Sequence, residues 1–209
     1  MRKRRVIHAV TVIFVLILAT AALAAPVRLK ISAKSQETLQ RAFAELRDKP
    51  HLAYFLLGNV YFGEKDYSSA IDAFLKALSI KSDMEEAYYN IGAAHYNAGE
   101  VDEALAAFED AQEVREDYVK AYQSAALIFH EKGDYDSAIA EQSRALEIEP
   151  GNPGLHFDLA VYYVDRYRFG DEETEDLEEG LLHYEKAEEI QPGFPHAKDN
   201  AGIISGILG

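Results

Sequence analysis

Residues 88–111 read YYNIGAAHYNAGEVDEALAAFEDA, a pattern typical of two short helices joined by a turn. The bulky residues Tyr88, Ile91 and His95 recur three and four positions apart, which places them on one helical face. After a break at residues 97–99, a second face combines small residues with one aromatic side chain: Ala104, Phe108 and Ala111. A hairpin of this size cannot bury its apolar face alone, so it needs neighbours of the same kind.

The same pattern recurs at a distance of 34 residues on both sides. The preceding copy consists of Tyr54, Gly58, Ala70, Phe74 and Ala77, and the following copy of Tyr122, Ala126, Ala138, Gln142 and Ala145. Only Gln142 departs from the size class of its counterparts. With these residues the chain resembles the tetratricopeptide repeat family, whose unit is a helix-turn-helix of about 34 residues.

The resemblance covers residues 52–192 and implies an all-α fold, a right-handed α-solenoid of stacked helix-turn-helix repeats. We expect four repeats, at residues 51–84, 85–118, 119–152 and 153–194. A capping helix is expected before and after them, within residues 25–50 and 195–209. In the fourth repeat the second-helix pattern returns eight residues late, at Gly180 and Tyr184. We therefore expect an acidic insertion around residues 168–178, in an exposed loop.

Residues 1–24 have the order of a secretory signal peptide. Four basic residues at positions 2–5 precede an apolar run and an alanine cluster, in which residues 22–24 form the expected cleavage motif. The alternative is an uncleaved anchor, since an apolar run of about 20 residues spans a bilayer. The expected location is therefore periplasmic or secreted, or membrane-anchored and facing the periplasm.

Composition restricts the classes of function. The four basic residues of the signal leave 17 of the 21 basic residues against 36 acidic ones, a net charge of about -19. Such a charge opposes binding to nucleic acid and to anionic membranes. The chain has no cysteine for disulfides, metal binding or redox chemistry, and its seven histidines lack the spacing of a helical zinc pair. We therefore predict no catalysis, no cofactor and no metal.

The acidic run at residues 171–176 is a candidate calcium site because dense carboxylates attract Ca²⁺. It lacks the alternating ligands and the central glycine of a helix-loop-helix calcium site. We favour a solvated loop that leads into a helix with acidic residues at its N-terminus, and Ca²⁺ binding is the weaker alternative.

The resemblance also indicates which residues line the inner face of the array. The candidate groove consists of Phe55, Asn59, Phe62, Tyr89, Asn90, Tyr96, Asn97, Lys120, Gln123 and His130. The corresponding positions in the fourth repeat are Phe157, Val161 and Val164. Aromatic and amide side chains suit a protein or peptide segment with apolar anchors held by hydrogen bonds. For Phe55 and Tyr89, packing against the next repeat is an equal alternative.

Some members of the family bind chaperones by holding the C-terminal carboxylate of the partner with five polar residues. Three of these positions match here, as Asn59, Asn90 and Lys120. The other two are Phe55 and Ser124, where basic residues are expected. One lysine beside two amides predicts only a weak anion site in so acidic a chain.

Two functions of different classes follow. The first is a non-catalytic protein–protein interaction adaptor in the cell envelope, which binds a partner segment in the concave groove. The alternative is a structural protein that forms a homo-oligomer through its C-terminal cap. The cap is unusually apolar because it contains Ile203, Ile204, Ile207 and Leu208, and exposed apolar area promotes association.

Overall fold

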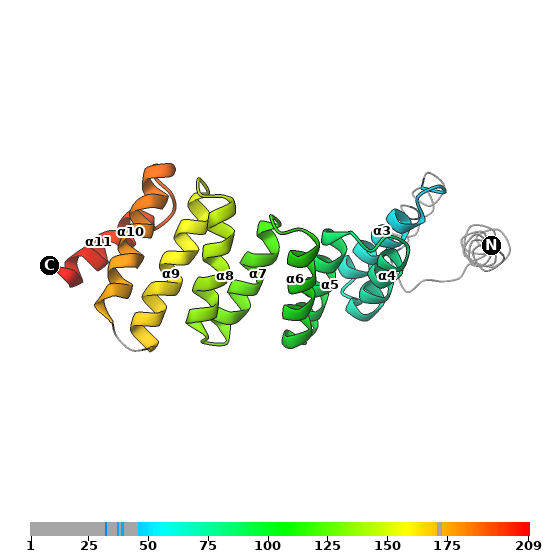
Figure 1. The fold of residues 1–209 in the computed structure, drawn as a ribbon, viewed down its shortest axis with the longest axis horizontal. Helices are drawn as coiled ribbons and strands as arrows, with labels where there is room; N and C mark the ends of the chain where they lie inside the picture. The colour runs from blue at the N-terminus through cyan, green and yellow to red at the C-terminus, as the bar shows by residue number, and fades with distance from the viewer. Residues whose placement is uncertain (1–31, 33–36, 38, 40–45, 171–172) are drawn as a thin grey trace. The chain divides into compact units, whose positions relative to one another are not determined.

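The computed structural model describes residues 32, 37, 39, 46–170 and 173–209. Every regular element in these ranges is an α-helix, which confirms the all-α helical repeat fold (Figure 1). The helices are α3 (Pro50–Gly63), α4 (Tyr67–Ile80), α5 (Glu85–Ala98), α6 (Val101–Val114), α7 (Val119–Glu131), α8 (Tyr135–Ile148), α9 (Pro153–Phe169), α10 (Thr174–Ile190) and α11 (Ala197–Leu208). The chain divides into two compact units, residues 1–100 and 101–209, and each is described by itself.

The expected signal peptide and most of the expected N-terminal capping helix lie outside the described residues. Leu39, from the second of these segments, is buried. Helix α3 begins at Pro50, whose fixed φ and missing N–H suit the first helical position. Within the described ranges, no helix is both long and apolar enough to cross a bilayer.

In the first unit, α4 packs against both α3 and α5. Ala70, Phe74 and Ala77 of α4 are completely buried. The ring of Phe74 lies directly on Gly58 of α3, where an added Cβ would stand 2.4 Å from Phe74 Cε1. The glycine therefore allows the two helices to approach closely, as its place in the repeat pattern indicates.

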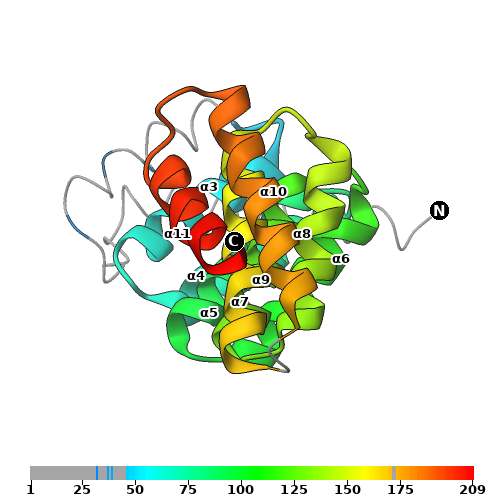
Figure 2. The same cartoon turned by 90° about the vertical axis from the view of Figure 1, so that its left-hand side faces the viewer.

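In the second unit, consecutive helices from α6 to α11 pack side by side, with the exposed end of α11 and its neighbour α10 visible in Figure 2. Asp134 begins α8 by accepting a hydrogen bond from the backbone N–H of Ser137 at 3.2 Å. Asp66 begins α4 in the same way, with Ser69 as the donor at 3.2 Å. The first and third repeats thus start their second helix with the same side-chain cap.

The fourth repeat contains the insertion, and most of it is helical. Both α9 and α10 have 17 residues, whereas α8 has 14. Helix α10 already begins at Thr174, so the expected exposed loop is shorter than the sequence indicated. Acidic residues in the first turn of α10 favour this early start because they interact well with the positive end of the helix.

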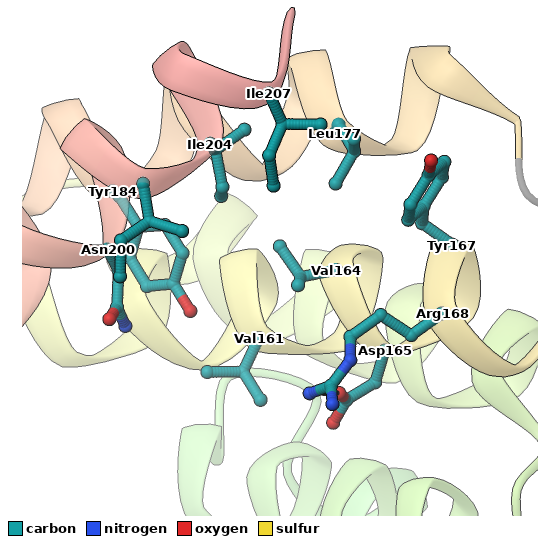
Figure 3. Close-up of a pocket in the computed structure, with 11 residues that line it drawn as sticks. Val161, Val164, Asp165, Tyr167, Arg168, Leu177, Tyr184, Asn200, Ile204 and Ile207 are labelled. Atoms are coloured by element: carbon teal, nitrogen blue, oxygen red, sulfur yellow. Dashed lines mark ion pairs between the residues drawn. The ribbon is translucent and has the colours of Figure 1, made fainter.

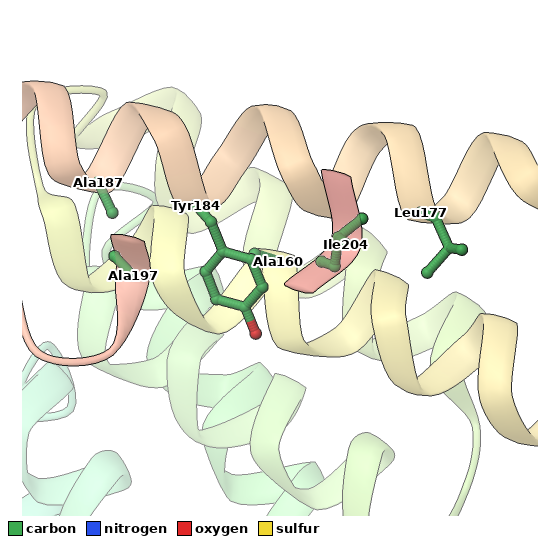
Figure 4. Packing of buried hydrophobic residues seen from close by; sticks show 6 residues of the cluster. All are labelled: Ala160, Leu177, Tyr184, Ala187, Ala197 and Ile204. Atoms are coloured by element: carbon green, nitrogen blue, oxygen red, sulfur yellow. The ribbon is translucent and has the colours of Figure 1, made fainter. Parts of the chain in front are cut away.

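The C-terminal cluster of buried residues joins α9, α10 and α11 (Figure 4). Its members are Ala160, Leu177, Tyr184, Ala187, Ala197 and Ile204. Tyr184 fills the space beside Ala160, while Ala197 and Ile204 anchor α11. Two further isoleucines of α11 are only partly covered, since Ile203 and Ile207 are 63% and 60% exposed.

Gln142 is the one departure from the core pattern, and it is completely buried in α8. Its Nε2 donates a hydrogen bond to the carbonyl oxygen of Leu155 at 3.0 Å. Its Oε1 is buried without a partner among the described residues. A buried polar atom in this state lowers stability because it has lost its bonds to water.

We predict that replacing two different glycines with alanine changes the free energy of unfolding in opposite directions. Gly58→Ala should lower the free energy of unfolding by about 1–3 kcal/mol, because the added methyl group overlaps the buried ring of Phe74. Gly202→Ala should raise it by up to about 1 kcal/mol, because nothing lies within 4 Å of that Cβ and alanine favours a helix. Urea denaturation followed by circular dichroism measures both, and changes of equal sign would contradict the packing described.

We also predict that Gln142→Leu raises the free energy of unfolding by about 1–3 kcal/mol, because it removes the unpartnered oxygen and keeps the volume filled. Gln142→Glu should lower it, since a carboxylate would be buried at the same place. Thermal denaturation of both variants tests the pair. A leucine variant less stable than the wild type would show that the amide has a partner after all.

Candidate functional site

Three asparagines of the expected groove lie in the first unit, and their amides are already hydrogen-bonded. Nδ2 of Asn90 donates to Oδ1 of Asn59 at 2.9 Å, so two adjacent repeats meet at this pair. Nδ2 of Asn97 donates to the carbonyl oxygen of Ala93 in its own helix at 2.8 Å. The pair uses one N–H of Asn90 and the side-chain oxygen of Asn59, so the second N–H of Asn90 and both N–H groups of Asn59 can still donate to a ligand.

The aromatic residues expected in the same groove are half-buried. The ring of Phe55 lies 5.6 Å from that of Phe74, and the ring of Phe62 lies 5.6 Å from that of Tyr67. Both contacts are made within the residue's own repeat and leave part of each ring accessible. Tyr89 and Tyr96 are likewise half-buried.

The remaining three expected residues belong to the second unit. Lys120 is exposed and Gln123 is half-buried. His130 stacks on Tyr162 with ring centroids 4.7 Å apart, and its Nε2 lies 2.8 Å from Oδ2 of Asp165. His130 is therefore held by α9, whereas Lys120 and Gln123 remain available for contacts.

A pocket with a volume of about 450 Å³ lies between α9, α10 and α11 (Figure 3). We call it the C-terminal pocket, and its lining is Val161, Val164, Asp165, Tyr167, Arg168, Leu177, Tyr184, Asn200, Ile203, Ile204 and Ile207. Aliphatic side chains of α9 face those of α11 across it. Its size falls within the range of ligand sites in proteins, and an apolar lining with a few polar groups is typical of them.

The polar groups of the C-terminal pocket are placed at its edges. Asn200 forms a hydrogen bond with the hydroxyl of Tyr184, whose pKa is raised by burial. Asp165 is bound by His130, and its Oδ1 lies 3.8 Å from Nη1 of Arg168. Arg168 occupies the last turn of α9, where a cation interacts well with the helix dipole.

Part of this pocket is predictable from the sequence. Val161 and Val164 occupy expected inner-face positions, and the apolar cap was recognised as a patch. Arg168 was missed because it was assigned to the insertion, and Leu177 because the start of α10 was placed too late. The signal that could have found Arg168 is a basic residue just before a break, which favours the end of a helix.

The acidic run leads into a structural ion pair. Asp176 is buried, and both its oxygens accept hydrogen bonds from Arg166, at 2.5 and 2.9 Å. Nη1 of Arg166 also donates to Asp136 of α8 at 2.6 Å. These bonds, the one to Asp176 first, raise the pKa of Arg166 above its ordinary value. Residues 171–172 of the run lie outside the described residues, but Asp176 is engaged by the protein itself.

Two histidines that are 27 positions apart in sequence meet between α9 and α10, which the spacing argument did not anticipate. The Nδ1 atoms of His156 and His183 are 2.9 Å apart, and Nε2 of His156 lies 3.1 Å from the carbonyl oxygen of Pro150. A carbonyl only accepts, so His156 is protonated on Nε2 and accepts the Nδ1–H of His183. Burial, followed by the proximity of His156, lowers the pKa of His183 to about 4.

In this arrangement the two rings form a hydrogen bond. Nowhere in the described ranges do three or more His, Cys, Asp or Glu residues converge in a way that would hold a metal ion. The arrangement instead requires that a single proton lie between the two rings. A second proton would place two N–H groups against each other.

Family models match the central part of the chain. Residues 58–99 match a model described as TPR repeat, and residues 86–153 match one described as tetratricopeptide repeat. No curated protein matches the sequence. The part of the chain that these models cover is thus made of tetratricopeptide repeats.

Solved structures agree in fold. The crystal structure of MamA has a TM-score of 0.62 at 21% identity, over 75% of this chain and 88% of that one. MamA from Desulfovibrio magneticus RS-1 has a TM-score of 0.63 at 16% identity, over 77% and 86%. YrrB, described as a TPR protein with an unusual peptide-binding site, has a TM-score of 0.59 at 23% identity, over 90% and 88%. At these identities the likeness concerns the fold.

The histidine pair predicts acid sensitivity. Because the pKa of His183 is lower in the folded chain than its ordinary 6.5, the unfolded chain binds more protons between about pH 4 and 6.5. The contribution of His183 is therefore fully present above pH 6.5 and is lost as the pH falls towards 4. In His183→Asn the amide N–H replaces the donor without titrating, so the free energy of unfolding should fall less over this range. Parallel pH curves for variant and wild type, from urea denaturation, would contradict the pairing.

Proposed function

We propose that this chain of tetratricopeptide repeats is a non-catalytic protein–protein interaction adaptor that binds a segment of another protein at the C-terminal pocket. The observation that carries the proposal is the open apolar wall of this pocket, where two isoleucines of α11 are more than half exposed. Exposed apolar side chains beside a preformed pocket are typical of interaction sites.

The energetics favour a segment with apolar anchors. Fully burying an isoleucine side chain contributes about 1.5–3 kcal/mol, so covering the open parts of Ile203 and Ile207 would contribute roughly half of that for each. The pocket is built on three helices that pack on a common core, so little ordering of the protein opposes binding. The segment therefore meets a rigid surface.

Two further observations support this assignment. One of the similar structures, YrrB, is described as having a peptide-binding site. The likeness in fold supports peptide binding by this chain as well. The first unit, taken by itself, presents partly accessible aromatic rings and the Asn59–Asn90 pair, which are suited to contacts with a protein segment of their own. We place the adaptor in the cell envelope, exported by its N-terminal segment.

Self-association is the second candidate function, and the exposure of Ile203 and Ile207 favours it. A second copy could cover the same apolar side of α11 and form a homo-oligomer. The net charge of -15 opposes this assembly, because both copies carry it. A partner of different sequence avoids the repulsion, and we therefore prefer the adaptor.

The adaptor is tested by selecting peptides from a random displayed library on the purified full chain. Ile207→Asp should weaken the selected peptides at least tenfold in fluorescence polarisation, because it places a carboxylate in the apolar wall. The matched control is Ser205→Asp, which makes the same charge change on α11 at an exposed residue outside the pocket. This control should bind as the wild type does.

Three results would contradict the adaptor. The first is a library that yields no binder, and the second is a set of peptides that bind Ile207→Asp and Ser205→Asp equally well. The third is a wild type that sediments as an oligomer and a variant Ile207→Asp that sediments as a monomer. That last result would establish self-association instead.

A further inference from the structure

The C-terminal pocket contains one charged group that the protein leaves largely unused. The side chain of Arg168 is 61% exposed, and its nearest carboxylate oxygen, Oδ1 of Asp165, is 3.8 Å away, beyond hydrogen-bond distance. Its guanidinium also lies 5.1 Å from the ring centre of Phe169. Among the described residues it thus has a weak ion pair and a cation–π contact, and its N–H donors remain available for a ligand.

Two of the other polar groups at the edges of the pocket, Asp165 and Asn200, have partners within the protein. Oδ2 of Asp165 lies 2.8 Å from Nε2 of His130. The side chain of Asn200 is hydrogen-bonded to the hydroxyl of Tyr184. Asp165 lies one turn before Arg168 on α9, and the two side chains lie together at one edge of the pocket (Figure 3). A ligand therefore meets an aliphatic wall and, at its edge, a cation with free donors.

We infer that the C-terminal pocket recognises a partner segment in which an apolar residue stands next to an aspartate or glutamate. The inference rests on the adaptor function proposed above. The apolar side chain packs between Val161 and Val164 of α9 and Ile207 of α11, and the neighbouring carboxylate accepts hydrogen bonds from Arg168. Guanidinium is suited to this role because its parallel N–H groups match the two oxygens of a carboxylate.

Charge complementarity selects this occupant over the others. A segment with lysine or arginine beside its anchor would place like charges together at Arg168. A second copy of the chain would bring the same pocket, with the same arginine and the same net charge of -15. The negative net charge of this chain would repel a partner segment with a run of acidic residues. The segment therefore carries one carboxylate beside its apolar anchor, and the residues on either side are neutral or basic.

A double-mutant cycle tests this inference on the full chain. The probes are the peptides selected on the wild type, synthesised with an amidated C-terminus so that their only carboxylates are side chains. Replacing the acidic residue with glutamine should weaken binding to the wild type about tenfold. The same replacement should have little effect on Arg168→Gln, because the partner of the carboxylate is gone. Thermal denaturation of the variant serves as the folding control, since an exposed side chain contributes little to stability.

Charge reversal gives a second, independent readout. Arg168→Glu should prefer a peptide with lysine at the acidic position, and Arg168→Lys should keep the preference of the wild type for the acid. Raising the salt concentration should weaken the wild-type complex more than that of Arg168→Gln.

The results separate this inference from the function on which it rests. Peptides that need Ile207 but bind equally well with glutamate, glutamine or lysine would overturn the inference and leave the adaptor intact. Selected peptides with a basic residue at the anchor would also overturn it. Peptides indifferent to Ile207 would overturn both, as would a wild-type dimer that Ile207→Asp dissociates.

Discussion

The contact between a small residue on the first helix of a repeat and a large residue on the second sets the distance between the helices. Phe74 on Gly58 is the tightest example, since not even a methyl group fits between them. Tyr184 beside Ala160 repeats the arrangement in the last hairpin. Within each unit, this spacing decides where neighbouring helices can lie, including those that line the C-terminal pocket.

The sequence predicted the helices and their cores well for a simple reason. Residues such as Ala70, Ala104 and Ala138 recur at a constant spacing and meet the same surroundings, so one pattern describes all of them. The same logic failed where the spacing changes. The insertion in the fourth repeat is mostly helix, and only the folded chain shows that Asp176 reaches Arg166 and that His183 reaches His156.

The candidate site illustrates the same limit. The family pattern indicated Phe55, Phe62, Asn59 and Asn90, and the structure places them with partners of their own in adjacent helices. The C-terminal pocket arises from three helices, and its depth depends on how α11 closes over α9 and α10. A repeat pattern treats α11 as one more first helix. It indicates that α11 is apolar, but not that Ile203 and Ile207 border a pocket shared with α9 and α10.

Arg166 joins three successive helices, since it belongs to α9 and binds Asp136 of α8 and Asp176 of α10. Helical arrays commonly lose structure from their ends inward, one unit at a time, because each unit touches only its neighbours. A cation shared in this way ties the third repeat to the fourth. Loss of structure in α9 and α10 should consequently also release the start of α8, so the walls of the C-terminal pocket and this ion-pair network persist or disappear together.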